Sequence, residues 1–231
     1  MSIKILHLSD THGFHRDLPA NIFEGIDMVI HSGDCSNWRD SARNYHEVFD
    51  FLEWYKDVPV EHKIYVAGNH DTSIEKRLIT KENFSDRGIV YLEHEMVEIC
   101  DLKIFGSPYT PTYGDWSFMK SRNNMHKLWS VMPQDIDILI THGPPKGVRD
   151  LSENMNGQLE QCGDLSLMKW IASFRPKAHL FGHIHDMSGI NNQGKSLYSK
   201  CPTIFSNGSC VHDGKFDIGL TSLGNVITLK K

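Results

Sequence analysis

Five short segments of the chain consist mainly of apolar and β-branched residues, which is the pattern of buried strands. They cover residues 3–8, 27–31, 63–67, 135–140 and 178–181. A polar block that contains glycine follows each segment directly. The blocks read SDTHG at residues 9–13, SGD at 32–34, GNHD at 68–71, THGPP at 141–145 and GHIH at 182–185. The sequence therefore predicts strands that each end in polar, turn-forming residues.

Two stretches between these strands show the period of an amphipathic helix. Residues 40–56 place Ala42, Tyr45, Phe49 and Leu52 on one stripe, and residues 162–174 show a similar stripe before Pro176. Strands that alternate with helices pair in parallel, and open parallel sheets bind ligands beyond the carboxyl ends of their strands. We therefore expect an α/β fold in which the five polar blocks meet at one edge.

Further strand-like runs occur in two regions, residues 88–106 and residues 197–231, where apolar segments alternate with turn residues. This arrangement predicts a second, more antiparallel sheet. No linker rich in Gly, Pro or Ser and no internal repeat divides the chain. We expect residues 1–231 to form a single domain.

Composition narrows the class of protein. The 231 residues are 39% hydrophobic and 23% charged, as in ordinary globular proteins. The net charge of -5 and the lack of long basic runs argue against stable nucleic-acid binding, and the short apolar runs argue against a membrane span. The first residues lack a signal-peptide pattern, and the five cysteines lack CxxC spacing, so we expect a cytoplasmic protein without disulfides or thiolate zinc. The sequence has no heptad pattern, so it leaves the oligomeric state open.

The polar blocks contain metal-ligating side chains. Residues i and i+2 of an extended chain project to the same side, so Asp10 with His12, and His183 with His185, can each chelate. Imidazole mixed with carboxylate and amide oxygen suits Mn, Fe, Ni, Co or Zn. Because the groups exceed one ion's needs, we expect two divalent transition-metal ions, with manganese favoured. The candidate ligands are Asp10, His12, Asp34, Asn69, His142, His183 and His185.

Each block on its own also has a structural interpretation. GNHD can be a simple turn, because Asn, Gly and Asp tolerate left-handed backbone, and GHIH can be a polar strand end. The joint occurrence of all five blocks at strand ends favours the metal site. Three other histidines lie within predicted strands and are expected in the core or behind the ligands: His7, His31 and His179. The remaining histidines are expected on the surface: His15, His46, His62, His94, His126 and His212.

The ordered set DxH, GD, GNHD, THGPP and GHIH resembles the calcineurin-like metallophosphoesterase family, and all five blocks are intact here. The resemblance implies a four-layer α/β/β/α sandwich of two packed mixed sheets, with a dinuclear metal site at the carboxyl ends of the strands. By the family pattern, one ion would be held by Asp10, His12, Asp34 and His185, and the other by Asp34, Asn69, His142 and His183. Asp34 would thus bridge the two ions.

The resemblance also implies hydrolysis of phosphoric esters, with phosphodiesters favoured, by in-line attack of a hydroxide that bridges the two ions. His70 would stay off the metals and protonate the leaving-group oxygen, and Asp71 beside it would orient the imidazole ring. Asn69 and His70 would also contact the substrate. Two alternatives remain open: a phosphomonoesterase or protein phosphatase built on the same site, and a non-catalytic interaction scaffold.

Differences between these motifs and those of known family members narrow the range of expected substrates. Serine/threonine phosphatases of the family read GDYVDRG and GNHE, whereas here Cys35 follows the second block and Asp71 ends the third. Residues 107–116, SPYTPTYGDW, resemble a segment of the small phosphodiesterases of the metallophosphoesterase-domain brain protein type. Two prolines stiffen this loop, so Tyr109 and Trp116 can stack a nucleobase or can simply pack over the sheet. The favoured substrate is a small nucleotide-like phosphate ester, with cyclic nucleotides as one candidate.

Three cations lie near these motifs and are candidates for gripping a phosphate: Lys120, Arg122 and Arg149. Arg149 comes just after THGPPKG and is the one we place among the substrate-binding residues. A solvated surface charge is the competing interpretation for each of them.

Overall fold

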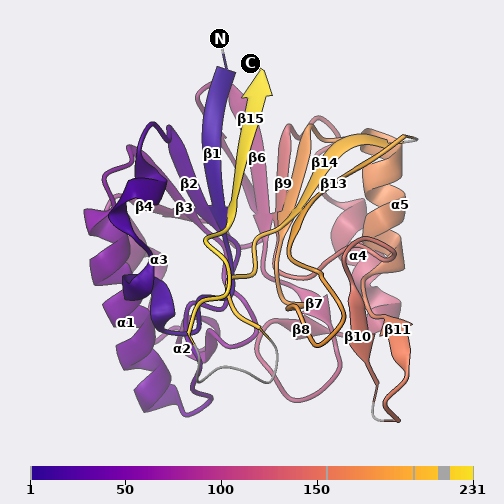
Figure 1. Cartoon of the computed structure of the whole chain (residues 1–231), viewed down its shortest axis with the longest axis horizontal. Coiled ribbons are helices and arrows are strands. Elements are labelled where there is room, and N and C mark those ends of the chain that lie inside the picture. Colours follow the sequence, from indigo (N-terminus) through magenta and orange to yellow (C-terminus); the bar gives the residue numbers. More distant parts are fainter. Residues whose placement is uncertain (1, 155, 200, 213–218, 231) are drawn as a thin grey trace.

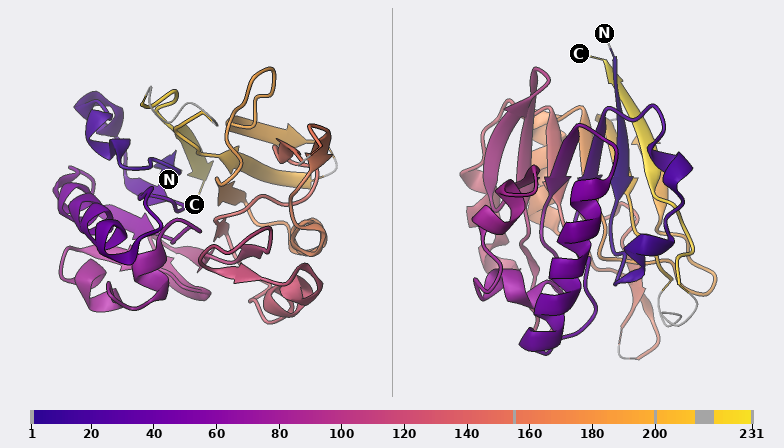
Figure 2. Two further views of the ribbon diagram at one scale, coloured as in Figure 1. Left: turned by 90° about the horizontal axis from the view of Figure 1, so that it is seen from below. Right: turned by 90° about the vertical axis from the view of Figure 1, so that its left-hand side faces the viewer.

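Two sheets lie face to face between two layers of helices (Figures 1 and 2). The computed structural model describes residues 2–154, 156–199, 201–212 and 219–230. The first sheet has the strand order β15 (Asn225–Lys230), β1 (Ser2–Leu8), β2 (Met28–His31), β3 (His62–Tyr65) and β4 (Ile89–Tyr91). The second has the order β13 (Gly194–Tyr198), β14 (Cys201–Asn207), β12 (Ala178–Phe181), β9 (Ile138–Thr141), β6 (Leu102–Ser107) and β5 (Glu95–Ile99).

Helices cover the outer face of each sheet (Figure 1). The first sheet is covered by α1 (Ser41–Asp57), α2 (Thr72–Glu75) and α3 (Lys81–Ser85), and the second by α4 (Met125–Ser130) and α5 (Leu165–Phe174). Two small strand pairs complete the described strands, β7 (Thr110–Pro111) with β8 (Met119–Lys120) and β10 (Leu151–Glu153) with β11 (Leu159–Gln161). Short 3-10 helices lie at Phe14–Asp17, Ala20–Phe23 and Arg122–Asn124. The four-layer α/β/β/α sandwich is therefore confirmed.

The layers follow from the period of two along each strand. Ile5 of β1 faces the second sheet and packs in one buried cluster with Ile138 of β9. The next residue, Leu6, points to the opposite face and joins a cluster with Phe51 of α1. A third buried cluster joins the second sheet to α4 and α5. Since successive side chains of a strand face opposite ways, nearly continuous apolar strands fill both the space between the sheets and the space under the helices.

The predicted strands are all present, but they are divided between the two sheets. β1, β2 and β3 pair in parallel in the first sheet, whereas β9 and β12 pair in parallel in the second. We expected the strands of residues 88–106 and 197–231 to form a separate, more antiparallel sheet. That expectation is wrong for β4 and β15, which join the first sheet. Choice of sheet depends on long-range pairing, which the local residue pattern does not encode.

Helix α1 begins where the sequence predicts, because the Asp40 side chain accepts a hydrogen bond from the main-chain N–H of Arg43. Its buried stripe is displaced from the predicted one: Val48 is buried and Ala42 is exposed. Helix α5 likewise begins after an aspartate cap, Asp164. In the part of the chain that the structure describes, every helix is too short or too polar to cross a membrane.

The parallel strands of both sheets point their carboxyl ends toward the end of the molecule opposite the two termini (Figure 1). Figure 2 shows this end from below in its left view. The polar blocks that follow the strands consequently meet there, across the gap between the two sheets.

Candidate active site

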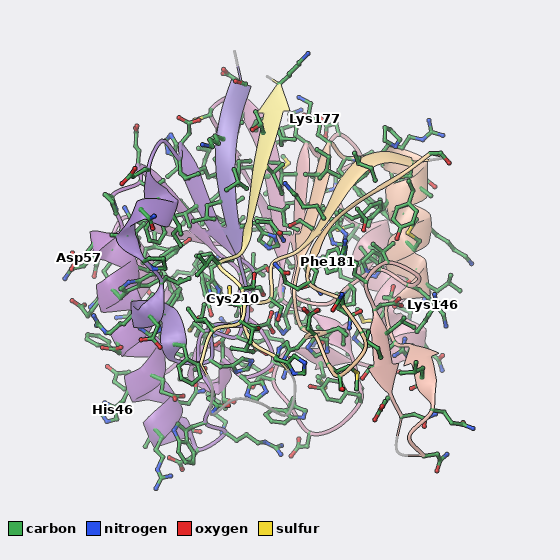
Figure 3. All side chains as sticks on the ribbon, viewed as in Figure 1. His46, Asp57, Lys146, Lys177, Phe181 and Cys210 are labelled. Carbon is green, nitrogen blue, oxygen red and sulfur yellow. The ribbon has the colours of Figure 1, made fainter. Side chains whose placement is uncertain are left out.

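All seven predicted ligands come together at this end of the sandwich. Phe181, labelled in Figure 3, is the last residue of β12 and marks where the block of residues 182–185 begins. Two groups each offer ligand atoms within 4.8 Å of one another: Asp10, His12 and His185 form one, and Asp34, His142 and His183 form the other. Each group therefore combines a carboxylate with two imidazoles from different strand ends.

The first group joins β1 to β12. Asp10 is fully buried, and its carboxylate accepts a hydrogen bond at 3.0 Å from the main-chain N–H of His183. The Nε2 atom of His185 lies 2.9 Å from the same carboxylate. These contacts hold the ends of the two sheets together at the point where the ligand atoms converge.

The second group centres on the buried ring of His142. Its Nε2 atom lies 2.9 Å from Oδ1 of Asn69 and 3.2 Å from Oδ2 of Asp34, so Asn69 completes this group. Its Nδ1 atom donates to the carbonyl oxygen of Ser32 at 2.9 Å. A histidine that donates from one ring nitrogen to a carbonyl keeps the other nitrogen available as a metal ligand.

Left-handed backbone occurs at four of the seven ligands. The φ angles are 50° at Asp10, 43° at His12, 56° at Asp34 and 70° at His183. Residues other than glycine adopt this conformation at a cost of about 1–3 kcal/mol, and they do so mostly at functional sites. The backbone strain therefore accompanies the side chains that the sequence singles out.

Glycines allow these loops to approach one another. A Cβ atom added to Gly33, whose φ is 113°, would lie 2.5 Å from Nδ1 of His142. A Cβ atom on Gly182 would collide with the carboxylate of Asp10. Both positions require glycine because ligand-bearing loops pack directly against the backbone there.

Charge at the site is set by burial and by carboxylate–imidazole pairing. Burial opposes ionisation of Asp10 and Asp34, but His185 and His142 respectively hold the pKa of each carboxyl below its ordinary value. Burial also opposes the charge on His142, yet Asp34 raises the pKa of that ring to about 9. Burial lowers the pKa of His183 to about 3. The two ionised carboxylates, beside the neutral ring of His183, attract cations, and a bound metal ion would displace the proton from the His142 ring.

These residues fit a pair of divalent ions. The donors are carboxylate, imidazole and amide groups, which is the set that transition metals bind, and they form two adjacent buried clusters. His12 has the same second contact as His142, because its Nδ1 atom lies 3.1 Å from the carbonyl oxygen of Ser36. Such contacts fix the ring orientation that a metal ligand needs.

His70 lies beside the two groups. Its Nδ1 atom lies 3.0 Å from the carbonyl oxygen of Asn37, and its main-chain N–H donates to Asp34 at 2.7 Å. The ring centroids of His70 and His12 are 4.8 Å apart. The side chain borders the cavity over the ligand groups, so Nε2 is the ring atom that can meet a bound molecule.

Asp71 does not orient the His70 ring, and that expectation is wrong. Its buried carboxylate accepts hydrogen bonds from the main-chain N–H groups of Asp34 at 3.0 Å and Gly68 at 2.7 Å, and from the Tyr65 hydroxyl at 2.6 Å. Adjacent side chains on a turn point to different sides, so Asp71 braces the second and third blocks from beneath. Its part in the site is to position Asp34.

Three buried histidines support the ligand-bearing loops from below, as the sequence analysis expected of residues in the core or behind the ligands. Each places a ring nitrogen 2.8–3.1 Å from a hydroxyl of a loop or strand end. The pairs are His7 with Ser32, His31 with Thr11, and His179 with Thr141.

His15 is buried, so its expected place on the surface is wrong. Its Nε2 atom lies 3.0 Å from Asp50 of α1, and its ring packs against Phe51. Of the other histidines expected at the surface, His46 and His126 are exposed. The remaining three, His62, His94 and His212, are half-buried.

A cavity of about 660 Å³ lies over the ligand groups. On one side it is lined by Asp34, Asn69 and His70, and on another by Tyr113 and Arg122. Residues of the β10–β11 hairpin form a further wall. The sequence analysis missed this hairpin, and no motif in it could have shown that it borders the site.

Three predicted substrate contacts, Tyr109, Trp116 and Arg149, are not among the described residues that line the cavity. Tyr109 packs on the core of the first sheet, with Phe118 6.2 Å away. Arg149 donates to the Ser196 hydroxyl at 2.7 Å and to main-chain carbonyls nearby, so it fixes the start of β13. Tyr109 therefore packs over the sheet, which is the alternative given for it, whereas Arg149 is neither a cavity residue nor a solvated surface charge. Trp116 lies against His70, with 4.3 Å between ring centroids.

Curated proteins match much of this chain. Metallophosphoesterase domain-containing protein 1 of Homo sapiens is 29% identical over 215 residues, which are 83% of this chain and 63% of that protein. A protein of Emericella nidulans named probable rhamnogalacturonate lyase C is 33% identical over 79% of this chain but only 17% of its own length. A UPF0046 protein of Caenorhabditis elegans is 32% identical, over 85% of this chain and 73% of that protein. The chain thus spans less than two thirds of the first two relatives.

Solved structures share the fold. One crystal structure covers 100% of this chain and 99% of its own, with a TM-score of 0.66 at 14% identity. A putative 5'-nucleotidase from Staphylococcus aureus has a TM-score of 0.52 at 13% identity, over 91% of this chain and 49% of that one. A family model described as Calcineurin-like phosphoesterase matches residues 3–187, which include all five polar blocks. The chain therefore belongs to the calcineurin-like phosphoesterase family.

Proposed function

We propose that this protein is a metal-dependent phosphodiesterase that acts on small nucleotide-like phosphate esters. The observation that carries the proposal is the pair of ligand groups on the floor of a cavity, with His70 at their side. Family membership supports hydrolysis of phosphoric esters at a dinuclear site. The retention of all seven ligands argues against a non-catalytic scaffold.

Two divalent ions at these positions would supply a nucleophile at neutral pH and would neutralise charge on the phosphoryl oxygens. In the proposal, Asp10, His12 and His185 hold one ion, Asn69, His142 and His183 hold the other, and Asp34 serves both. The ligand chemistry admits Mn, Fe, Ni, Co or Zn, of which we favour Mn.

His70 is the proposed general acid. Because Nδ1 is engaged by the Asn37 carbonyl, the protonated ring donates from Nε2 to the departing oxygen. A general acid of this kind contributes typically about 10²- to 10⁴-fold in rate. Asp71 acts only through the backbone that it braces.

The size and lining of the cavity support a substrate larger than a phosphate group. Tyr113 is 57% exposed, lines the cavity, and has its ring 5.3 Å from that of His183. It takes the place of Tyr109 as the aromatic residue that can stack a nucleobase.

The five cysteines are free, which suits the reducing cytoplasm, and we propose that location.

A phosphomonoesterase is the alternative, and one observation favours it. Arg122 lines the cavity while donating to the carbonyl oxygens of Gly163 and Cys162. A guanidinium there can contact the additional charge of a monoester dianion.

The test compares hydrolysis of bis-p-nitrophenyl phosphate and p-nitrophenyl phosphate in the presence of each candidate metal. Asp34→Asn should lose bound metal and activity together, because it removes the shared ligand. Asp57→Asn makes the same chemical change on the outer side of α1, far from the site, and should behave as the wild type (Figure 3). Faster turnover of the diester supports the proposal. Faster turnover of the monoester selects the alternative, and activity that survives Asp34→Asn refutes the assigned site.

A further inference from the structure

The loop of residues 112–118 packs on the third polar block. The main-chain N–H of Ser117 donates to the carbonyl oxygen of Asn69 at 3.2 Å, and that of Phe118 donates to Glu75 at 2.7 Å. These bonds place the indole of Trp116 against the imidazole of His70, with 4.3 Å between centroids and 33° between planes. The loop thus contacts the proposed proton donor directly.

A second residue holds the indole in place. The guanidinium carbon of Arg39 lies 4.1 Å from the centroid of the Trp116 ring, and the same group donates to the main-chain oxygen of Asp115. Stacking of a guanidinium on an indole is favourable and adds to the hydrogen bond. Because Arg39 and His70 already pack against this ring, Trp116 is not an open platform for a nucleobase.

The imidazole of His70 needs neighbouring rings that hold its orientation. Its hydrogen bond from Nδ1 to the Asn37 carbonyl fixes one ring atom but leaves the ring free to tilt about that contact. The Trp116 face at 4.3 Å and the His12 edge at 4.8 Å restrict this tilt from two directions. Proton transfer demands alignment of donor and acceptor within hydrogen-bond reach, so a ring that tilts loses rate.

We propose that Trp116, held by Arg39, is a positioning residue that keeps Nε2 of His70 directed at the leaving-group oxygen. This inference rests on the proposed function, because it takes His70 as the proton donor. It assigns the aromatic loop a part in the chemical step, in place of the substrate stacking that its sequence suggests.

The test uses leaving groups that differ in their need for a proton. A p-nitrophenolate leaves without protonation, whereas phenolate is a poorer leaving group and depends on a general acid. Methyl p-nitrophenyl phosphate and methyl phenyl phosphate form one pair of substrates, and p-nitrophenyl phosphate and phenyl phosphate form a second pair for a monoesterase. Neither pair carries a nucleobase, so stacking of a base cannot contribute.

Trp116→Ala should lower kcat on the phenyl ester by at least tenfold and change kcat on the p-nitrophenyl ester by less than threefold. Trp116→Phe keeps an aromatic face and should recover most of the loss. The matched control is Trp38→Ala, because Trp38 is 50% exposed and its ring packs under the Arg43 guanidinium at 4.5 Å rather than against His70. This control should match the wild type on both esters.

The double variant with His70→Ala separates positioning from general destabilisation. If Trp116 acts through His70, then Trp116→Ala should have less than a twofold effect once His70 is absent. Equal losses on both leaving groups, or a full effect in the absence of His70, would overturn the inference. Metal content and thermal unfolding, measured on every variant, identify one that fails to fold. If Trp116→Ala fails, Arg39→Ala carries the test, because it removes the exposed group that holds the indole and should show the same dependence on the leaving group.

Failure of the inference is distinguishable from failure of the proposed function. If His70→Ala itself shows no dependence on the leaving group, then the general-acid assignment is wrong. If His70→Ala shows that dependence and Trp116→Ala does not, the assignment stands and the positioning role is refuted.

Discussion

Replacement of Asp71 tests whether this carboxylate is structural or catalytic. Asp71→Ala removes the acceptor of the Asp34 and Gly68 N–H groups and of the Tyr65 hydroxyl. Asp71→Asn keeps one oxygen for these donors if its amide nitrogen faces the Ser36 hydroxyl, which lies 2.9 Å from the other carboxylate oxygen and can turn to accept. The two variants therefore differ in how many buried donors lose their partner.

The expected stability loss follows from those donors. A buried donor without a partner costs about 1–3 kcal/mol, and the two main-chain N–H groups cannot turn elsewhere. Asp71→Ala should therefore lose about 4 kcal/mol of unfolding free energy. Asp71→Asn should lose about 1 kcal/mol, because burial and the nearby Asp34 charge already raise the pKa of Asp71 and disfavour its ionised form. The difference of about 3 kcal/mol is a large part of the stability of a typical domain.

Urea unfolding of the metal-free protein measures this difference, and metal content and turnover are measured on the same samples. Asp71→Asn should bind metal and turn over substrate within a few-fold of the wild type. The structural assignment would be refuted if Asp71→Asn lost about 10²-fold or more in kcat while its stability and metal content were unchanged. Equal stability of the two variants would refute the hydrogen-bond argument.

Two further predictions concern residues that support the site. Burial lowers the pKa of His7, His31 and His179 to about 3 in the folded protein, against an ordinary value of 6.5, so protons bind the unfolded chain first as the pH falls. The stability that these three rings contribute is fully present above pH 6.5 and should fall below that pH by up to about 4 kcal/mol per pH unit. Urea midpoints that do not change between pH 7 and 5 would contradict this. Arg149→Lys should lower stability by about 1–3 kcal/mol through lost bonds at β13 and leave kcat on a small ester within threefold; a selective rise in KM would restore its predicted contact with substrate.

The sequence was sufficient to predict which seven side chains come together in the candidate site, because each of them lies within four residues of the end of a strand. A strand fixes the direction of the chain, so a ligand one to three residues beyond its end has a defined place. Asp10, Asp34 and His142 all follow this rule. Arg149 lies eight residues beyond the end of β9, in a loop where the direction of a side chain depends on contacts that the sequence does not show. Tyr109 lies only two residues beyond β6, but packing on the core of the first sheet directs its side chain away from the cavity. Burial of His15 beneath α1 depends on packing in the same way.

The division into two sheets explains why the ligands converge even though the predicted pairing was incomplete. A single sheet would place the block after β12 several strands away from the block after β1. Two sheets packed face to face put these strand ends opposite each other, so that Asp10 meets the His183 amide at 3.0 Å. Packing of one sheet on another therefore supplies the short distance between ligand groups, and the left-handed backbone at Asp10 and His183 turns their side chains into the gap. Such strained turns persist because glycine contacts and buried hydrogen bonds fix the surrounding loops.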